Sequence, residues 1–140
     1  DGMTRLGSKT IQADAPVFAT LIGRFVPLQV PLISTSWDGN DTKTTGTYTI
    51  DTSSIFGAPA GIKAALVQIS GQWSSANGGY TAGLRPSGGT TNAGIIRAQV
   101  ANISSDLMTI VPCDANGDFS VVVAGASMNY AVLRIWGYWK

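Results

Sequence analysis

Turn signals recur along this sequence at intervals so short that only short elements fit between them. Glycine occurs 17 times, often beside Asn, Asp, Ser or Pro, and the runs between are rich in Val, Ile, Thr, Tyr and Trp. Short runs of β-branched and aromatic residues bounded by turn residues are typical of β-strands. The expected strands are Thr45–Ile50, Ile62–Trp73, Gly79–Leu84, Ile95–Ile103, Leu107–Cys113, Phe119–Ala124 and Tyr130–Trp139.

Two of these segments constrain the fold further. In Ile62–Trp73 neither set of alternating side chains is cleanly polar, so both faces of this strand are expected to be covered. The turn Asp114–Asp118 contains Asn116-Gly117, a pair that suits the positive φ of a tight hairpin. Roughly seven to nine short strands joined by such turns predict an all-β fold, an antiparallel and jelly-roll-like β-sandwich.

The first third of the chain is less regular. Pro16, Pro27 and Pro31 interrupt an apolar stretch from Val17 to Ile33. Proline cannot donate a hydrogen bond to a sheet, so this stretch is expected to be an edge strand or an extended arm. We favour an arm that packs on a neighbouring subunit. The alternative is the first strand of the same sandwich, with its ends marked by proline.

The chain is therefore expected to have two parts. Residues 1–44 would form the Pro-containing N-terminal arm or stalk connection together with a first edge strand, and residues 45–140 would form the β-sandwich. The best helix candidate is Ala13–Phe25, although the spacing of its apolar residues is poor.

The chain contains no His and no Glu, and its eight acidic residues are all Asp. His is the commonest general acid or base near neutral pH, so Ser-His-Asp and Cys-His catalytic groups are excluded, as are His-based metal sites. The Asp residues lie in different expected turns, and nothing places two of them at the separation that glycoside hydrolysis needs. We expect no enzymatic activity, no catalytic residue and no cofactor.

The surface of this chain is poor in charge. Charged residues make up 12% of the sequence and the net charge is +1, whereas a soluble domain has about twice that charged share. We expect part of the surface to be hidden against copies of the chain or a partner, which would also protect sheet edges that few charges guard. Basic residues are scattered singly, so nucleic-acid binding is not expected. No apolar run is long enough for a membrane-spanning helix.

Two loops, Trp37–Asp41 and Trp73–Tyr80, combine aromatic and polar side chains as sugar-binding sites do. An aromatic ring offers a rigid face for the C–H side of a pyranose, while Asp, Asn or Arg bonds the hydroxyls. The alternative is that Trp73 ends a core strand and its loop only turns, and that Arg85 is a solvated loop residue. The candidate glycan-binding residues are Trp37, Asp38, Asn40, Asp41, Trp73, Asn77, Tyr80 and Arg85.

Two clusters of oxygen-bearing side chains resemble calcium ligands. They lie within Asp38–Asp41 and Asp114–Asp118, and no Glu follows either cluster to act as a bidentate ligand. Each is explained more simply as a turn in which Asp and Asn bond their own backbone, so no metal site is expected. Cys113 ends an apolar run and is expected to be a small buried hydrophobic residue.

The C-terminal segment places three aromatic residues within Trp136–Trp139. Strict alternation would put Trp136 and Tyr138 on one face of a strand, and Gly137 and Trp139 on the other. Gly137 indicates close approach by another backbone or ring. This strand either closes the core of the sandwich or forms a subunit interface, where Trp and Tyr are favoured, and opposite faces of the strand could do both. The expected interface residues are Phe25, Val26, Leu28, Trp136, Tyr138 and Trp139.

Several short motifs follow one another in the second half of the chain. They are an Ile50-Asp51-Thr52-Ser53-Ser54 opening, an Ala58-Pro59-Ala60-Gly61 turn, the strand from Ile62 to Ile69, Val111-Pro112-Cys113 before the Asn116-Gly117 hairpin, and Ile135-Trp136-Gly137-Tyr138-Trp139 at the end. This order resembles the small β-sandwich domains at the ends of tailed-phage tail fibres, tailspikes and head fibres. The resemblance spans roughly Thr45 to Lys140.

The resemblance implies a homotrimeric tip domain of a phage virion surface fibre or spike. Its partners would be other virion proteins and a host cell-surface glycan, and its location the surface of the virion. Two alternatives stay open on the sequence alone. One is a purely structural virion protein, such as a capsid decoration or tail component. The other is a carbohydrate-binding module of a secreted enzyme.

Overall fold

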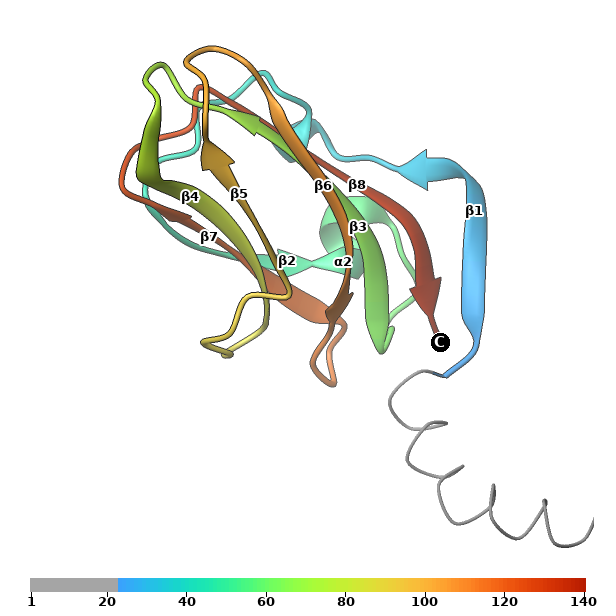
Figure 1. Ribbon diagram of the computed structural model, residues 1–140. Coiled ribbons are helices and arrows are strands. Elements are labelled where there is room, and N and C mark those ends of the chain that lie inside the picture. The colour runs from blue at the N-terminus through green and yellow to red at the C-terminus, as the bar shows by residue number, and fades with distance from the viewer. Residues whose placement is uncertain (1–22) are drawn as a thin grey trace, which may run out of the picture.

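A computed structural model describes residues 23–140, which form two packed β-sheets (Figure 1). Both sheets are antiparallel and each has four strands. The elements are β1 (Phe25–Leu32), the 3-10 helix η1 (Thr35–Trp37), β2 (Gly46–Asp51), α2 (Thr52–Phe56), β3 (Ala64–Gln72), β4 (Asn77–Pro86), β5 (Gly94–Ala98), β6 (Ser105–Pro112), β7 (Asp118–Ala124) and β8 (Tyr130–Trp139).

The strand order is β1-β8-β3-β6 in one sheet and β2-β7-β4-β5 in the other. The chain crosses between the sheets after most strands, so neighbours within a sheet are mostly distant in sequence. Eight antiparallel strands in two sheets with these crossings make a jelly roll. The predicted all-β, jelly-roll-like sandwich is therefore confirmed.

The core lies between the two sheets, because every strand turns alternate side chains inward. In β3 the inward residues are Val67 and Ile69, and in β8 they are Leu133 and Ile135, all fully buried. Phe119 faces them from β7 of the other sheet. Burying each such side chain contributes about 1.5–3 kcal/mol, so this core can stabilise the domain without a disulfide.

One side of the sandwich is sealed by contacts between β5 and β6, the last strands of the two sheets. The Ser105 hydroxyl donates to the Arg97 carbonyl oxygen at 2.8 Å, and the Thr109 hydroxyl donates to Ala93 at 3.2 Å. A Cβ on Gly94 would lie 2.5 Å from the Leu107 side chain, so a larger residue there would force that side chain to move. Side-chain bonds therefore satisfy carbonyl groups that an open sheet edge would leave exposed.

β1 lies at the edge of its sheet and pairs with β8 through an irregular register. Pro27 and Pro31 both lie in β1, at the edge where proline is tolerated. For residues 25–32 the alternative interpretation is therefore correct, since they form the first strand of the sandwich. Phe25 begins this strand, so it is not part of a helix. Gly23 and Arg24 are not helical either. Residues 1–22, with Pro16 and residues 13–22 of the helix candidate, lie outside the described residues.

All seven expected strands are present, although the structure differs from the prediction in two places. The expected strand Ile95–Ile103 ends at Ala98, because the chain turns there and Asn102 adopts a φ of 57°. The helix α2 was not expected. Its N-cap Asp51 accepts hydrogen bonds from the Ser53 and Ser54 backbone amides, and the left-handed Gly57 ends it. Both caps are standard helix boundary signals that the sequence carried.

The last strand departs from strict alternation at Trp136. Leu66 of β3 pairs with Gly137 and Val67 pairs with Ile135, so Trp136 is an extra residue in β8. A bulge of this kind shifts the following side chains to the opposite face. Trp136 bonds outward-facing Gln68, whereas Tyr138 packs against the core. The expectation that Trp136 and Tyr138 share a face is therefore wrong.

Candidate functional site

The outside of the β1-β8-β3-β6 sheet carries apolar side chains in contact with solvent. On β6, Met108 is 50% exposed and Ile110 is 51% exposed, and at the far edge Phe25 of β1 is 40% exposed. Register places Met108 beside Gln68 and Ile110 beside Leu66 on β3. We call this surface the outer apolar face; its residues are Phe25, Pro27, Leu66, Gln68, Met108, Ile110, Pro112, Trp136 and Trp139.

Two contacts hold the aromatic residues of this face in place. The rings of Phe25 and Trp139 lie 4.5 Å apart between centroids, and the Phe25 ring covers Gly137, where a Cβ would lie only 2.6 Å from it. The expected close approach of a ring at Gly137 is confirmed. The Trp136 indole nitrogen donates to the Gln68 side-chain oxygen at 2.8 Å. The apolar surface is thus an ordered one.

The expected interface residues divide between the two sides of the sheet. Phe25, Trp136 and Trp139 belong to the outer apolar face. Val26 pairs with Tyr138, which packs against the core, and Leu28 is half-buried in the irregular part of β1. Sequence analysis missed Met108 and Ile110. Their signal was present, because both alternating faces of Leu107–Cys113 are largely apolar.

The four strands of this sheet contain two charged residues, Asp106 on β6 and Arg134 on β8. Register pairs Asp106 with Ser70 and places Arg134 beside Gln68, so both point outward and β3 lies between them. Within residues 23–140 neither charge forms an ion pair. A hollow of about 120 Å³ opens beside Arg134, lined also by Ile33, Ser34, Trp37, Asp38, Val132 and Leu133.

A second candidate surface is the end of the sandwich where four connecting segments meet, at the top of Figure 1. These segments are residues 33–45, 73–76, 99–104 and 125–129, and we call them the loop end. The Trp73 indole donates to the Ala126 carbonyl, and the Asn102 backbone amide donates to Trp73. Lys43 and Met128 exchange two backbone bonds. These contacts tie the four segments into one surface.

Both candidate sugar-stacking tryptophans are buried. Trp73 is 1% exposed and Trp37 is 4% exposed, so neither ring offers a face to a ligand in this structure. The alternative interpretation of Trp73, the end of a core strand, is correct. Trp37 packs edge-on against Tyr48, and the Lys43 ammonium lies 4.4 Å from its ring centroid. Tyr80 is half-buried and packs against the core.

The polar glycan candidates are only partly brought together. Asp38, Asn40 and Asp41 are exposed in the loop end, where the Asp38 carboxylate accepts from the Asn40 amide at 3.1 Å. Asn77 begins β4 and accepts from the Gly79 amide. Arg85 lies near the end of β4, at the opposite end of the sandwich, where its Nε donates to the Asn92 side-chain oxygen at 2.7 Å. It therefore cannot share a ligand with the other polar candidates.

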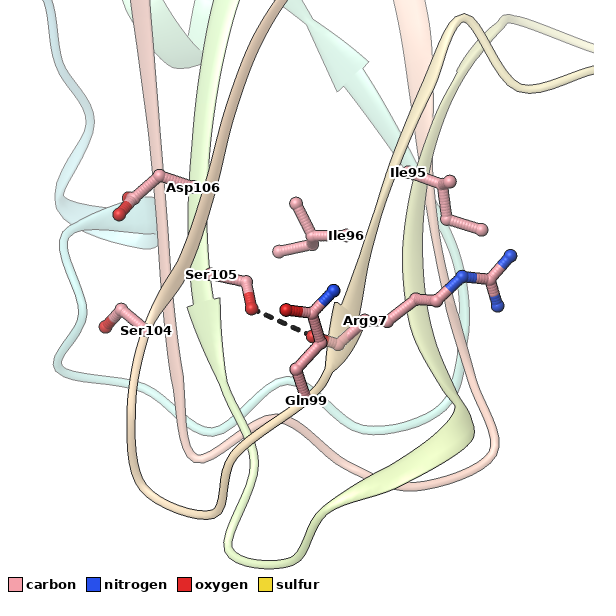
Figure 2. Close-up of a pocket in the computed structure, with 7 residues that line it drawn as sticks. All are labelled: Ile95, Ile96, Arg97, Gln99, Ser104, Ser105 and Asp106. Atoms are coloured by element: carbon pink, nitrogen blue, oxygen red, sulfur yellow. Dashed lines mark hydrogen bonds between the residues drawn. The ribbon is translucent and has the colours of Figure 1, made fainter.

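A polar hollow of about 340 Å³ lies beside the loop end, between β5 and β6 (Figure 2). Arg97 reaches away along its rim and donates to the Gly78 carbonyl at 3.0 Å. The Ser105 hydroxyl donates to the Arg97 carbonyl oxygen between two of the residues that line it (Figure 2). Its lining residues are Ile95, Ile96, Arg97, Gln99, Ser104, Ser105 and Asp106.

The clusters considered for calcium are turns. The Asp114 carboxylate accepts from the backbone amides of Asn116 and Asp118 at 2.9 and 3.0 Å. Burial, with Asp114 and Asp51 nearby, raises the pKa of Asp118, whereas hydrogen bonds from the Ser54 and Ser53 region lower the pKa of Asp51. In the described part of the chain, no group of three or more His, Cys, Asp or Glu side chains is arranged to hold a metal ion.

Burial also governs Cys113, whose thiol pKa rises to about 12. A thiol with that pKa carries almost no thiolate near neutral pH and is unreactive. The expectation of a hydrophobic role is consistent with its half-buried position. Among residues 23–140, no helix is long and apolar enough to cross a membrane.

Comparisons with known proteins show little similarity. No protein-family model matches the chain, and no curated protein matches it. One solved structure, that of the infectious bursal disease virus Gx strain, is similar over 83% of this chain with 14% identity and a TM-score of 0.28. The match covers 31% of that viral chain, so this chain spans about a third of its length. A likeness at this level carries no argument about function.

Proposed function

We propose that this chain is a self-assembling surface domain of a viral particle, a homotrimeric tip of a phage fibre or spike. The observation that carries the proposal is the outer apolar face. A monomeric protein rarely exposes a contiguous apolar patch unless a partner covers it. The assignment of the domain to a phage particle is supported by the resemblance of residues 45–140 to fibre and spike domains.

The composition of the face supports an interface rather than a solvated surface. Interface centres are depleted of charge and enriched in Trp, Phe and Met, which are the residues gathered here. Phe25 packs against Trp139, and Trp136 bonds Gln68, so these side chains are already ordered in a single copy. They therefore lose less conformational entropy when the copies associate. Large, rigid aromatic side chains of this kind are frequent centres of binding energy.

The mass in solution tests this proposal. We expect the full chain to have the mass of three subunits by sedimentation equilibrium, and Met108→Lys to weaken association at least tenfold. Thr47→Lys is the matched control, since Thr47 is exposed on the other sheet and its replacement should leave the mass unchanged. Thermal unfolding of both variants verifies the fold. A monomeric wild-type chain at high concentration would overturn the proposal.

A second function, contact with a host glycan, is favoured by the loop end. Hydrogen bonds join its four segments, and the exposed Asp38, Asn40 and Asp41 project from one of them. Loops fixed on a rigid sandwich are a common place for binding residues. Here the polar side chains would supply the contacts, because the two tryptophans are part of the core.

Binding to a glycan array and to host envelope fractions tests this second function. We expect Asp41→Ala combined with Asn40→Ala to reduce binding, while Thr90→Ala at the opposite end leaves it unchanged. Trp37→Ala and Trp73→Ala would be uninformative, because removing a buried indole destabilises the domain. A trimer that binds no glycan would leave the purely structural virion protein as the function.

A further inference from the structure

We propose that the outer apolar face joins two copies through its unlike halves, with β6 of one copy seated on β8 and the end of β1 of the next. This inference rests on the proposed function and deepens it by naming the contact. The first half presents Asp106, Met108 and Ile110 from β6. The second presents Arg134 and the hollow of about 120 Å³ beside it.

Charge complementarity is the first argument. Asp106 and Arg134 are the two charged residues of the four strands, and they have opposite signs. Within one copy β3 separates them by two strand spacings, about 10 Å, so they do not pair. Placing β6 of one copy over β8 of another brings each carboxylate to a guanidinium. The pairing removes two charges that would otherwise oppose burial of the face.

Shape is the second argument. Met108 and Asp106 lie two residues apart on β6 and therefore point in the same direction. When Asp106 meets Arg134 of the next copy with the two strands antiparallel, Met108 lies toward Val132. It is then positioned at the hollow, whose lining is Ile33, Ser34, Trp37, Asp38, Val132, Leu133 and Arg134. A methionine side chain is flexible and unbranched, so it fills irregular apolar hollows well.

The two halves differ, so this contact runs head to tail. Each copy uses β6 toward one neighbour and β8 toward the other. Such an interface closes into a ring when the rotation between copies allows it, and three copies are the smallest ring beyond a dimer. The contact is therefore compatible with the homotrimer of the proposed function, and a ring leaves no half of the face unoccupied.

Charge exchange tests the ionic part of the contact. We expect Asp106→Arg and Arg134→Asp each to weaken association at least tenfold. The double variant should recover most of the wild-type association, because the charges again have opposite signs across the interface. If the single variants weaken association and the double variant is no better, the pairing of Asp106 with Arg134 is wrong. Circular dichroism verifies the fold of all three variants.

Cross-linking tests the position of Met108. In a Cys113→Ser background, Met108→Cys with Ile33→Cys should form intermolecular disulfides on mild oxidation and give covalent trimers. Within one copy the two positions lie more than two strand spacings apart, about 10–14 Å, too far for a disulfide. Met108→Cys with Thr47→Cys is the control and should not yield covalent trimers. If the wild-type chain is a trimer but the variant with Met108→Cys and Ile33→Cys does not cross-link, this contact is wrong and self-assembly still holds. If the wild-type chain is a monomer, both the contact and the proposed self-assembly are wrong.

Discussion

The outsides of the two sheets differ although their insides are alike. Both sheets turn a continuous row of buried apolar side chains toward the shared core. Outside, the β1-β8-β3-β6 sheet exposes Phe25, Met108 and Ile110 and contains two charged residues. The β2-β7-β4-β5 sheet exposes Thr47 and Thr49 and contains four charged residues, Asp51, Asp118, Arg85 and Arg97.

This difference separates the inner surfaces, which folding requires, from an outer surface that folding does not require to be apolar. The inner faces alone account for a stable sandwich, since burial there does not depend on what lies outside. The solvent-exposed apolar area of an outer face adds little to the stability of one copy and exposes it to association. The second sheet shows that the same fold can cover itself with threonine and charge. The apolar character of the first sheet is therefore not required by the fold itself.

The largest effects should fall equally on both sheets. Leu133→Ala in β8 and Leu84→Ala in β4 each remove a fully buried side chain. We expect each to lower the free energy of unfolding by about 2–5 kcal/mol, because a cavity remains where the side chain was. Urea unfolding measures both. Costs that differ by more than this range between the sheets would show that the inner faces are not equivalent.

Replacing a glycine by alanine should cost more stability at Gly137 in the first sheet than at Gly78 in the second. A Cβ at Gly137 would lie 2.6 Å from the Phe25 ring, so we expect Gly137→Ala to cost about 1–3 kcal/mol through overpacking. Gly78→Ala in β4 is the control, since nothing lies within 4 Å of a Cβ there. Adding Phe25→Ala to Gly137→Ala should recover part of the loss in thermal unfolding. Equal costs at the two glycines would contradict the ring contact.

Each outer face also has one side-chain hydrogen bond that can be removed. Trp136→Phe loses the bond to Gln68, and Asn92→Ala loses the bond from Arg85. We expect each to lower stability by about 0.5–1.5 kcal/mol. Trp136→Phe should also weaken self-association, whereas Asn92→Ala should not. Sedimentation of both variants measures this, and a similar loss of association in both would remove the distinction between the faces.

The smallest effect concerns two carboxylates on the second sheet. Asp51 and Asp118 lie opposite each other on β2 and β7, and one oxygen of Asp118 is buried without a hydrogen-bond partner. Because the pKa of Asp118 is raised above 3.8 in the folded chain, the folded state binds that proton more tightly. Its contribution to stability is therefore lost as pH rises from 3.8 through the raised pKa.

The pKa of Asp51 is shifted the other way, so its stabilisation is present above 3.8 and lost as pH falls through the lowered pKa. We expect Asp118→Asn to gain stability relative to the wild type as pH rises through the first window, by a small amount because the carboxylate is only partly buried and solvent screens its charge. Chemical unfolding at a series of pH values measures it. A constant difference across that window would contradict the raised pKa of Asp118.

Much of the fold could be predicted from the sequence, because strands and turns are encoded locally. The Asn116-Gly117 hairpin and the doubly covered β3 both follow from residue type and a period of two. The bulge at Trp136 could not be predicted, since it depends on how β8 pairs with a strand far away in sequence. That one extra residue reversed the expected faces of the C-terminal aromatic residues.

The candidate glycan site was harder to predict for a related reason. Local sequence marks an aromatic residue next to a turn, but whether the ring enters the core depends on distant neighbours. Trp73 and Trp37 both belong to the core cluster, where the Trp73 indole bonds Ala126 and the Trp37 ring packs against Tyr48. Arg85 was grouped with residues at the other end, because only the strand order shows which loops meet.

The described chain begins at Gly23, just before β1, and this position determines how the domain would carry mechanical load. The chain enters the sheet beside Lys140, where Arg24 and Lys140 exchange two backbone bonds, at the end of the sandwich opposite the loop end (Figure 1). Tension between a tether at this entry and a ligand at the loop end runs along the strands, so the perpendicular hydrogen bonds resist together in shear. Force between Gly23 and Lys140 would instead peel β1 from β8 one bond at a time.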